Sequence, residues 1–519
     1  MPLNLTSCMP SEFKNQSASP YFAAIDLGSN SFHLLIVSVN NGVLETVDRV
    51  KEMVQIAIGL RQNHSLSEEA QARALHCLSC FQERIRDIPP EQVRVVGTKA
   101  LRRAENAGQF IREAEAALGH SIDIISGYEE ARLIYLGVAH DISKDKGRPL
   151  IIDIGGGSTE FIIGAQNNTL MESLSIGCVT YSDRFFTHRE NRTAQPINNK
   201  QINEAYYATC LELEIITQRY RRRGWDIVAG SSGTMRAIAD LMPKDVISGV
   251  ITRDGLDILV GHLRQGNSIS EVSGADDISN RRLNVLPAGI VILKAIFDQL
   301  QLDEIHVVNT TLKEGLIYDT LGRLSARDMR DKTVEKMMEQ YQVDKTQAAR
   351  VNQTLQKFIR GLATPIASGV DIEKALRWAA LLHEIGLSIS HSGYHHHGAY
   401  LLQHSDLAGF SRFEQELMAI FIGSHRRKIR SSRLVALAET QKYLAAYFAC
   451  FRLAILLNRR REDNVALPEV TLDHRLVTLQ FADGWLEEHP LTYRTLVEER
   501  QYLTPLNIQL DFFSIISDD

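Results

Sequence analysis

Short apolar runs that end in glycine-rich turns recur along the N-terminal part of the chain. Tyr21–Asp26 is followed by Gly-Ser-Asn-Ser and then by a second apolar run, Phe32–Val39. Apolar runs bounded by turn residues predict a strand, a tight turn and a returning strand. The arrangement returns at Pro149–Asp153, where a triple-glycine turn leads into Glu160–Gly164. Two copies predict an internal duplication, in which two α/β domains enclose a cleft.

Other segments of residues 21–320 fit the same α/β pattern. Further strands are expected at Val93–Gly97, Ile122–Ile125, Asp226–Gly230 and Ile305–Val308, and a helix is expected at Ser67–Arg86. Two of these strands lead into further turns, at Ser231–Thr234, where a helix follows from Met235, and at Asn309–Gly315. Alternating strands and helices are typical of α/β folds.

The pattern changes near residue 325. Apolar positions recur at helical spacing in Met329–Ala363, Ile372–Ile389 and Phe413–Ser424, whereas Val470–Leu472, Leu476–Phe481 and Leu506–Phe513 resemble short strands. We therefore expect a disordered lead-in at 1–20, α/β domains at 21–136 and 137–320, an all-helical domain at 325–458 and a small α+β domain at 465–519.

The composition is typical of a soluble globular protein. Of the 519 residues, 44% are apolar and 23% are charged, and the formal net charge is −6. No apolar run approaches the roughly 20 residues of a membrane span, and the N-terminal stretch lacks the apolar core of a secretory signal. A negative net charge gives no general attraction to nucleic acid. We expect neither a membrane nor a nucleic-acid polymer as partner.

The cysteines and the basic runs add smaller constraints. Cys77 and Cys80 form a lone CxxC pair inside a helical pattern, and the six cysteines are scattered. This usage disfavours zinc and favours buried thiols in the reducing cytoplasm. Four short basic runs are present, at Arg221–Arg223, Arg281–Arg282, His425–Lys428 and Arg459–Arg461. Each alone is typical of a solvated helix end, and together they offer a path for a polyanion other than DNA.

The two glycine-rich turns carry residues suited to binding phosphate. The candidates are Gly28, Ser29, Asn30 and Ser31 in the first turn and Gly155, Gly156, Gly157, Ser158 and Thr159 in the second. Glycines let the backbone approach a phosphate with its N–H groups turned inward, and hydroxyl groups donate further hydrogen bonds. Each turn follows a carboxylate, Asp26 or Asp153, at a strand end where a metal ion or water can be held. One such turn alone is also compatible with a plain hairpin.

Two further segments are candidates for phosphate contacts. Ser232, Gly233 and Thr234 precede a helix, whose N–H groups and dipole favour an anion, although a capped helix without ligand has the same pattern. Arg102 follows the strand at Val93–Gly97 and can fork onto phosphate oxygens. The alternative for Arg102 is a surface helix.

Paired glutamates, Glu129 and Glu130, open a predicted helix between the two turns. Carboxylates are favourable at a helix N-terminus without any catalytic role. In the functional interpretation they supply a general base that activates water for attack on phosphorus. Glu160, just after the triple glycine, is placed to hold a divalent cation with Asp153. Mg²⁺ is typically bound by one or two carboxylates together with substrate phosphates.

Several long motifs resemble the exopolyphosphatase / guanosine pentaphosphate phosphohydrolase (Ppx/GppA) family. They are AAIDLGSNSFHLLI, VVGTKALRRAENA, ISGYEEARLIYLGVAH, IIDIGGGSTEFIIG, SIGCVTY and AGSSGT, followed by WAALLHEIGLSISHSG and HHHGAYLLQHSDLAGF. The resemblance extends over nearly the whole chain. It implies two actin-like, ribonuclease-H-type domains with the active site in their cleft, then an all-α HD-like domain and a small α+β C-terminal domain.

The resemblance also implies Mg²⁺-dependent release of orthophosphate by a homodimer. Carried over residue by residue, it implies that Glu130 is the catalytic base and that Arg102 binds phosphate. It implies that Asp153 and Glu160 serve the metal ion and the water, and that Gly155–Thr159 form the phosphate loop.

The helical domain resembles an HD-type metal phosphohydrolase but departs from the active pattern, because the defining His-Asp pair is His383-Glu384. The nearby histidines His391, His395, His396, His397 and His404 resemble a metal cluster. Without the metal-binding Asp, we expect a degenerate domain that serves substrate binding or dimerisation.

Two substrates are implied by the resemblance: guanosine pentaphosphate, converted to the tetraphosphate alarmone of the stringent response, and inorganic polyphosphate. Stretches such as DIPPEQVRVV and RRREDNVALPEVTL favour the nucleotide, whereas HSGYHHHGAYLLQHSDLAGF favours the polymer. We expect guanosine pentaphosphate, with polyphosphate as the alternative or a second substrate. An actin-like sugar kinase or ATPase is disfavoured by the ISGYEEAR segment, and a non-catalytic alarmone sensor by intact Glu130, Asp153 and Glu160.

Overall fold

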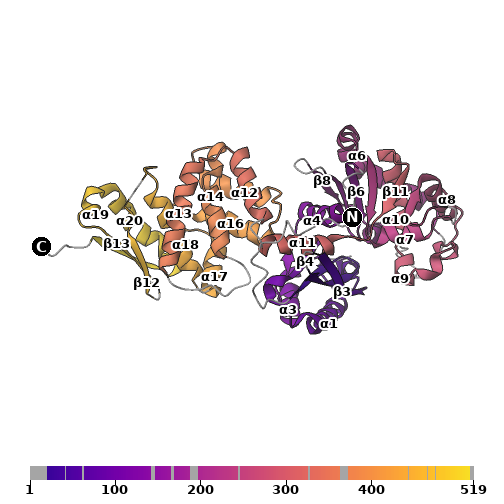
Figure 1. Cartoon of the computed structure of the whole chain (residues 1–519), viewed down its shortest axis with the longest axis horizontal. Helices are drawn as coiled ribbons and strands as arrows, with labels where there is room; N and C mark the ends of the chain where they lie inside the picture. Colours follow the sequence, from indigo (N-terminus) through magenta and orange to yellow (C-terminus); the bar gives the residue numbers. More distant parts are fainter. Residues whose placement is uncertain are drawn as a thin grey trace. The chain divides into compact units, whose positions relative to one another are not determined.

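The computed structural model divides the chain into two compact units, residues 1–328 and 329–519 (Figure 1). It describes residues 20–40, 43–60, 64–141, 147–164, 169–186, 197–243, 246–324, 328–362, 372–441, 443–463, 466–473 and 475–514. The expected lead-in lies outside the described residues, apart from residue 20.

The first unit contains two mixed sheets with the same internal order. In the first, the strands run β3 (Val43–Glu52), β2 (Phe32–Asn40), β1 (Tyr21–Leu27), β4 (Val93–Gly97) and β5 (Asp123–Ile124). In the second, they run β8 (Leu170–Leu174), β7 (Thr159–Ile163), β6 (Pro149–Ile154), β9 (Ile227–Ser231), β11 (Glu304–Val307) and β10 (Val250–Thr252). β1 is antiparallel to β2 and parallel to β4, as β6 is to β7 and β9. The repeated order confirms the predicted duplication, with β10 added at one edge.

Helices cover both faces of these sheets. The longer ones are α1 (Glu68–Ile85), α3 (Ala107–Leu118), α4 (Gly127–Asp141), α6 (Asn199–Arg223), α8 (Arg253–Arg264), α10 (Leu286–Leu300) and α11 (Leu312–Leu324). Short helices α2 (Lys99–Arg103), α5 (Cys178–Tyr181), α7 (Gly233–Asp240) and α9 (Asn280–Leu283) lie in the connections. α1 is the helix predicted at Ser67–Arg86, and the Ser67 side chain caps it by accepting a hydrogen bond from Ala70 N.

Alternation along β1 explains how one apolar strand serves two cores. Ala23 and Ile25 pack in a core with α1 and α3, whereas Phe22 and Ala24 pack in a second core that α4 and α11 share with both sheets. Neighbouring strand residues point to opposite faces, so a strand covered on both faces is apolar throughout. We call each sheet with its own helices a lobe. Because α4 and α11 pack against both sheets in the second core, these two helices link the two lobes.

The two linking helices approach each other at glycines. A Cβ on Gly315 of α11 would lie 1.8 Å from the carbonyl oxygen of Leu133 in α4. A Cβ on Gly137 of α4 would lie 2.6 Å from the carbonyl oxygen of Thr311. Only glycine leaves room for this backbone contact. The expected domain boundary at 136/137 falls within α4, so its assignment stays a prediction.

The second unit joins a helical bundle to a three-stranded sheet. Its helices are α12 (Met329–Gln340), α13 (Lys345–Gly361), α14 (Ile372–Leu382), α15 (Tyr394–His404), α16 (Arg412–Ser424), α17 (Ser432–Thr440), α18 (Leu444–Leu457), α19 (Trp485–Glu488) and α20 (Pro490–Leu503). The sheet order is β12 (Glu469–Asp473), β13 (Leu476–Phe481) and β14 (Gln509–Ser514). One apolar core includes residues of both parts, such as Phe358 and Leu479. The domains expected at 325–458 and 465–519 therefore share a core.

Two expected elements differ in detail from the structure. The helical pattern of Met329–Ala363 is interrupted after Gln340, because Asp344 caps α13 by accepting a hydrogen bond from Gln347 N. The pattern of Ile372–Ile389 is an α-helix only to Leu382, after which Ile385–Ser388 forms a 3-10 turn. Within the described residues, no helix is long and apolar enough to cross a membrane.

Candidate active site

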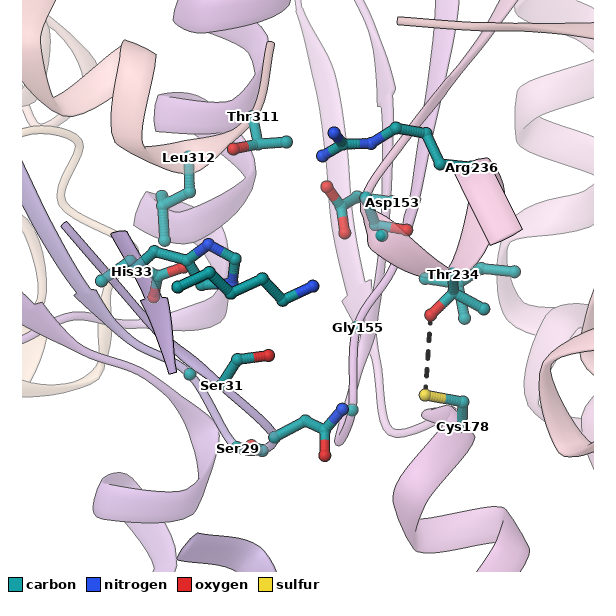
Figure 2. Close-up of a pocket in the computed structure, with 18 of the residues that line it drawn as sticks. Ser29, Ser31, His33, Asp153, Gly155, Cys178, Thr234, Arg236, Thr311 and Leu312 are labelled. Carbon is teal, nitrogen blue, oxygen red and sulfur yellow. Dashed lines mark hydrogen bonds between the residues drawn. The ribbon is translucent and has the colours of Figure 1, made fainter. Parts of the chain in front are cut away.

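A cavity of about 520 Å³ lies between the two lobes of the first unit, where the ends of β1 and β6 face each other (Figure 2). Of the predicted site residues it is lined by Asp26, Gly28, Ser29, Asn30, Ser31, Glu130, Asp153, Gly155, Gly156, Gly157, Ser158, Ser232, Gly233 and Thr234. The structure thus brings together residues that are far apart in the sequence.

Strand register explains why these side chains meet. Asp26 lies beside His33 of β2 and Val96 of β4, near the end of β1. Asp153 holds the matching place on β6, beside Glu160 of β7 and Ser231 of β9. Carboxyl ends of parallel strands form a single edge of a sheet, so each aspartate emerges at the cavity.

The two glycine turns close in the same way and touch across the cavity. Gly28 N donates to Ser31 O at 3.2 Å, and Gly155 N donates to Ser158 O at 2.9 Å. A Cβ on Gly157 would lie 3.2 Å from Ser29 Oγ, so glycine permits this approach. Lys99 Nζ, from the first lobe, donates to Gly157 O at 2.7 Å and holds the second turn.

The third predicted turn also faces the cavity, at the start of α7. Ser232 has a positive φ of 98° and accepts a hydrogen bond from Met235 N, which caps the helix. Thr234 Oγ1 is 3.6 Å from Cys178 Sγ (Figure 2). The carbonyl oxygen of Gly233 accepts from the Arg282 guanidinium. The turn is thus held from two sides.

Four largely buried carboxylates lie at the cavity or just behind its lining. Burial, and then the charge of Glu130, raises the pKa of Asp26 to about 8. Burial raises the pKa of Asp153 to about 6, although a hydrogen bond from Ser231 acts to lower it. Burial also raises the pKa of Glu130, although Arg102 opposes it, and raises the pKa of Glu160 well above its ordinary range. A cation bound beside these carboxylates would favour their charged forms.

The donor set fits a hard divalent cation that is shared with a phosphate. Asp26 Oδ1 is buried and has no hydrogen-bond partner within the part of the chain that the structure describes. In that part, no three His, Cys, Asp or Glu side chains are grouped so as to hold a metal ion by themselves. Mg²⁺ commonly takes one or two carboxylates and completes its shell with water and phosphate oxygens.

Cationic side chains on the cavity were not predicted individually. They are Arg49, Lys51, Arg236, Arg282 and Lys313, with His33 beside them. Burial, then the nearby Arg282, lowers the pKa of Lys51 to about 8. Arg236 Nε is buried without a partner among the described residues, and Figure 2 shows its guanidinium beside Asp153. Arg282 belongs to a basic run, Lys313 to the turn at Asn309–Gly315 and Arg236 to the helix after the predicted turn at Ser231–Thr234, but Lys51 carries no sequence signal.

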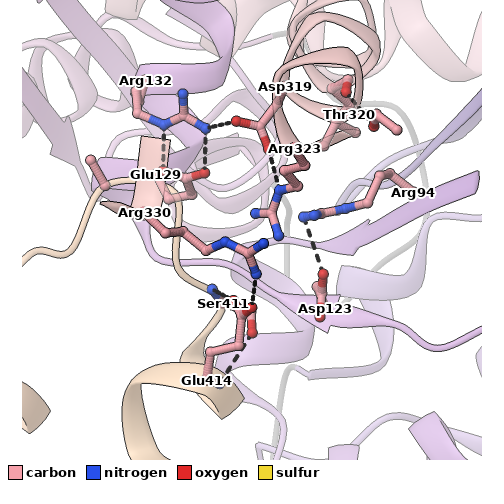
Figure 3. Close-up of polar contacts among 12 residues, drawn as sticks. Arg94, Asp123, Glu129, Arg132, Asp319, Thr320, Arg323, Arg330, Ser411 and Glu414 are labelled. Atoms are coloured by element: carbon pink, nitrogen blue, oxygen red, sulfur yellow. Dashed lines mark hydrogen bonds and ion pairs between the residues drawn. The ribbon is translucent and has the colours of Figure 1, made fainter. Parts of the chain in front are cut away.

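Of the predicted site residues, Glu129 and Thr159 do not line the cavity. Both carboxylate oxygens of Glu129 accept hydrogen bonds from Arg132, at 2.7 and 2.8 Å (Figure 3). Thr159 is fully buried, and its hydroxyl donates to Ile176 O at 2.6 Å. Neighbouring positions on a helix or strand point to different faces, so only Glu130 and Ser158 of each pair reach the cavity.

Arg102 and Glu160 lie just behind the cavity lining. Arg102 Nη1 donates to Ile125 O at 2.6 Å and to Glu130 Oε2 at 3.2 Å, so it contacts the candidate base. Glu160 Oε1 accepts from Ser173 Oγ at 2.8 Å, and its charge acts on Glu130 and Asp153. Whether either side chain contacts phosphate or metal stays a prediction.

The histidines of the second unit form a different group from the predicted one. The buried His383 and His395 lie near His425, with ring centroids 6.0 and 5.9 Å from it. His383 Nδ1 and His425 Nδ1 contact the carbonyl oxygens of Ala380 and Ile422. Glu384 is paired with Arg461 at 2.6 Å. Of the five clustered histidines only His395 is buried; His391, His396 and His404 are exposed and His397 is half-buried.

The sequence matches one protein family along most of its length. Residues 35–324 match the Ppx/GppA phosphatase family, and residues 329–500 match Ppx/GppA phosphatase, domain III. A guanosine-5'-triphosphate,3'-diphosphate pyrophosphatase of Pseudoalteromonas translucida (strain TAC 125) is 36% identical over 499 residues, covering 94% of this chain and 97% of that protein. The protein of that name from Vibrio cholerae serotype O1 (strain ATCC 39315 / El Tor Inaba N16961) is 37% identical over 500 residues, covering 95% and 99%.

Solved structures agree with the architecture. An exopolyphosphatase from Cytophaga hutchinsonii ATCC 33406 is 25% identical with a TM-score of 0.52, covering 58% of this chain and 98% of that one. An exopolyphosphatase-like protein at 24% identity and a TM-score of 0.52 covers 59% and 100% and shows the fold alone. The actin-like fold expected from the resemblance is confirmed. The chain belongs to the Ppx/GppA phosphatase family.

Proposed function

We propose that this chain hydrolyses the terminal phosphoanhydride bond of guanosine pentaphosphate, with Glu130 as the general base. The observation that carries the proposal is the meeting of Glu130, two strand-end aspartates and two glycine turns on one cavity. The relatives from Pseudoalteromonas and Vibrio bear the name of a pyrophosphatase for this nucleotide.

The turns and cations of the cavity would bind the phosphate chain. Backbone N–H groups near Gly156 and the hydroxyls of Ser29 and Ser31 offer hydrogen bonds to phosphate oxygens. Lys51 and Lys313 have pKa values lowered first by burial, and a bound phosphate would favour their charged forms. The cations therefore offset the charge of the substrate, which a cavity of carboxylates alone would repel.

Asp26 and Asp153 are the residues that would hold a Mg²⁺ ion, together with phosphate oxygens. When bound, the cation supplies neutralisation of negative charge on the terminal phosphate. Glu160, behind Asp153 in the β6–β7 pair, would support that site through its charge.

Glu130 is placed to take a proton from the attacking water. The water oxygen bonds to the terminal phosphorus, the bridging P–O bond breaks, and orthophosphate leaves while the nucleotide keeps the remaining phosphates. Burial raises the pKa of Glu130, which brings it toward the working pH, where a general base is most effective. Arg102 fixes the carboxylate at 3.2 Å.

The rim of the cavity favours a nucleotide over a polymer of phosphate. Asp240 and Asp277 are exposed and line the same cavity. Two carboxylates repel an all-phosphate chain, whereas a carboxylate accepts hydrogen bonds from the adjacent N–H groups of guanine. Polyphosphate is the second candidate, because a solved structure of the same architecture is named an exopolyphosphatase. We also propose a homodimer in the cytoplasm, which light scattering and cell fractionation would test.

Replacing the base tests the proposal. Glu130→Gln should lower phosphate release by about 10²–10⁴-fold while the nucleotide still binds. Glu69→Gln, an exposed change in the first turn of α1, is the matched control and should leave turnover unchanged. Turnover of Glu130→Gln within tenfold of the parent would show that the base is another group.

A further inference from the structure

A buried ion network joins the linking helices beside the candidate base (Figure 3). Arg132 of α4 donates to both oxygens of Glu129 and, through Nη2, to Asp319 Oδ1 of α11 at 2.5 Å. Asp319 Oδ2 accepts in turn from Arg323 Nε at 2.7 Å. Glu129, Arg132 and Asp319 are 1%, 6% and 6% exposed, so none of these charges is screened by water.

Arg132 and Asp319 stabilise each other in their charged forms. Burial alone would lower the pKa of Arg132, but Glu129 and Asp319 raise it far above its ordinary value. Burial would raise the pKa of Asp319, but Arg132 and then Arg323 hold it well below its ordinary value. Arg132 and Asp319 therefore stay charged, and their contact does not change with pH near neutrality.

The network begins in the same helical turn as Glu130. Glu129 and Glu130 are neighbours in the first turn of α4, yet only Glu130 lines the cavity. The Ser126 hydroxyl accepts from Glu129 N at 3.1 Å, so the same turn is also capped. Gly137 and Gly315 bring the two helices together further along, and the Arg132–Asp319 ion pair is a second point at which α4 is held against α11.

We propose that Glu129 and Asp319, acting through Arg132, are positioning residues that hold Glu130 at the reacting water. The inference rests on the proposed function. Arg132 is suited to this task because its planar fork binds Glu129 bidentately and leaves a donor for Asp319. Displacing a general base by about 1 Å is enough to cost on the order of 10²-fold in rate.

The experiment measures kcat and KM for orthophosphate release from guanosine pentaphosphate by Asp319→Asn. We expect kcat to fall by about 10–100-fold and KM to stay within about threefold, because the phosphate-binding turns are untouched. In a Glu130→Gln background the same change should cause no further loss, because the base that it positions is gone. If Asp319 had a purely structural role, Asp319→Asn would lower kcat by the same factor in the parent and in the Glu130→Gln background.

A matched control comes from the second unit, where Arg452 binds both oxygens of the buried Glu499, at 2.5 and 2.9 Å. Glu499→Gln breaks an equally buried fork and should leave kcat unchanged. If Asp319→Asn does not fold, Glu129→Gln is measured in its place, because it leaves Arg132 paired with Asp319. The expected loss of kcat is the same. If kcat is unchanged in the positioning variant while Glu130→Gln is inactive, the positioning role alone is overturned. If Glu130→Gln is active, the proposed base is overturned.

Discussion

Asp26 and Asp153 occupy equivalent places in the two repeats of the first unit. Each is the second-to-last residue of the first strand of its sheet, β1 or β6, and each precedes a turn closed by a glycine N–H donating to a serine carbonyl. Duplication therefore placed two carboxylates at one cavity. Burial and the charge of Glu130 raise the pKa of both, so a bound cation would favour their charged forms.

The stability of the metal-free protein should fall as pH rises. Folding raises the pKa of Asp26 from 3.8 to about 8 and that of Asp153 to about 6. Between these values the folded state keeps protons that the unfolded state releases, so each group costs about 1.4 kcal/mol per pH unit within its own window. Urea unfolding at about pH 5 and about pH 8, with a chelator, measures the loss. Asp26→Asn should lose less stability over that interval; an identical loss would contradict the assignment.

Removal of divalent cations should abolish phosphate release, and added Mg²⁺ should restore it. Asp153→Asn should raise the Mg²⁺ concentration for half-maximal activity by roughly tenfold or more, because one of two candidate metal-binding carboxylates is lost. The measurement is a Mg²⁺ titration of turnover. Asp87→Asn, at a side chain that is 90% exposed, is the control and should leave the titration unchanged. A titration of Asp153→Asn that matches the parent would place the metal elsewhere.

Gly315→Ala should destabilise the first unit by about 2 kcal/mol or more, because its Cβ would lie 1.8 Å from the carbonyl oxygen of Leu133. The helices α4 and α11 cannot move apart at this contact without displacing both lobes. Gly261→Ala in α8 has no atom within 4 Å of the added Cβ and should stabilise by roughly 0.5–1 kcal/mol. Urea midpoints of the two variants should therefore move in opposite directions, and a shared direction would argue against a close crossing.

Asp277→Asn should affect the nucleotide substrate selectively. Loss of a charged acceptor for guanine should raise KM for guanosine pentaphosphate by roughly tenfold. Hydrolysis of polyphosphate should be unchanged or improved, because a repulsive charge has been removed. Steady-state kinetics on both substrates give the comparison, and equal effects on the two would mean that Asp277 does not contact the base.

Local sequence signals predicted the turns of this site and most of its strands. Asp26, Gly155 and their neighbours lie at or next to a strand end. There, apolar runs predict the strands, and the glycines and carboxylates predict the phosphate site. Arg236 follows the predicted turn at Ser231–Thr234 without being singled out, whereas Lys51 was missed because nothing near it in sequence shows that β3 borders the cavity. That proximity depends on how the two lobes pack.

The choice between adjacent residues also needed the structure. Glu129 and Glu130 both suit the first turn of a helix, and only the structure shows that Glu129 pairs with Arg132 and Glu130 with Arg102. The histidine run at 391–404 suggested a cluster, but the ring near His383 and His395 is His425, which lies on another helix end. Contacts between distant elements carry this information.

The central claim is tested most directly by orthophosphate release from guanosine pentaphosphate and from long-chain polyphosphate, measured side by side at equal enzyme and Mg²⁺ concentrations. The account predicts a higher kcat/KM for the nucleotide, with both activities lost in Glu130→Gln. A hundredfold preference for the polymer would contradict the substrate, and full activity of Glu130→Gln would contradict the mechanism.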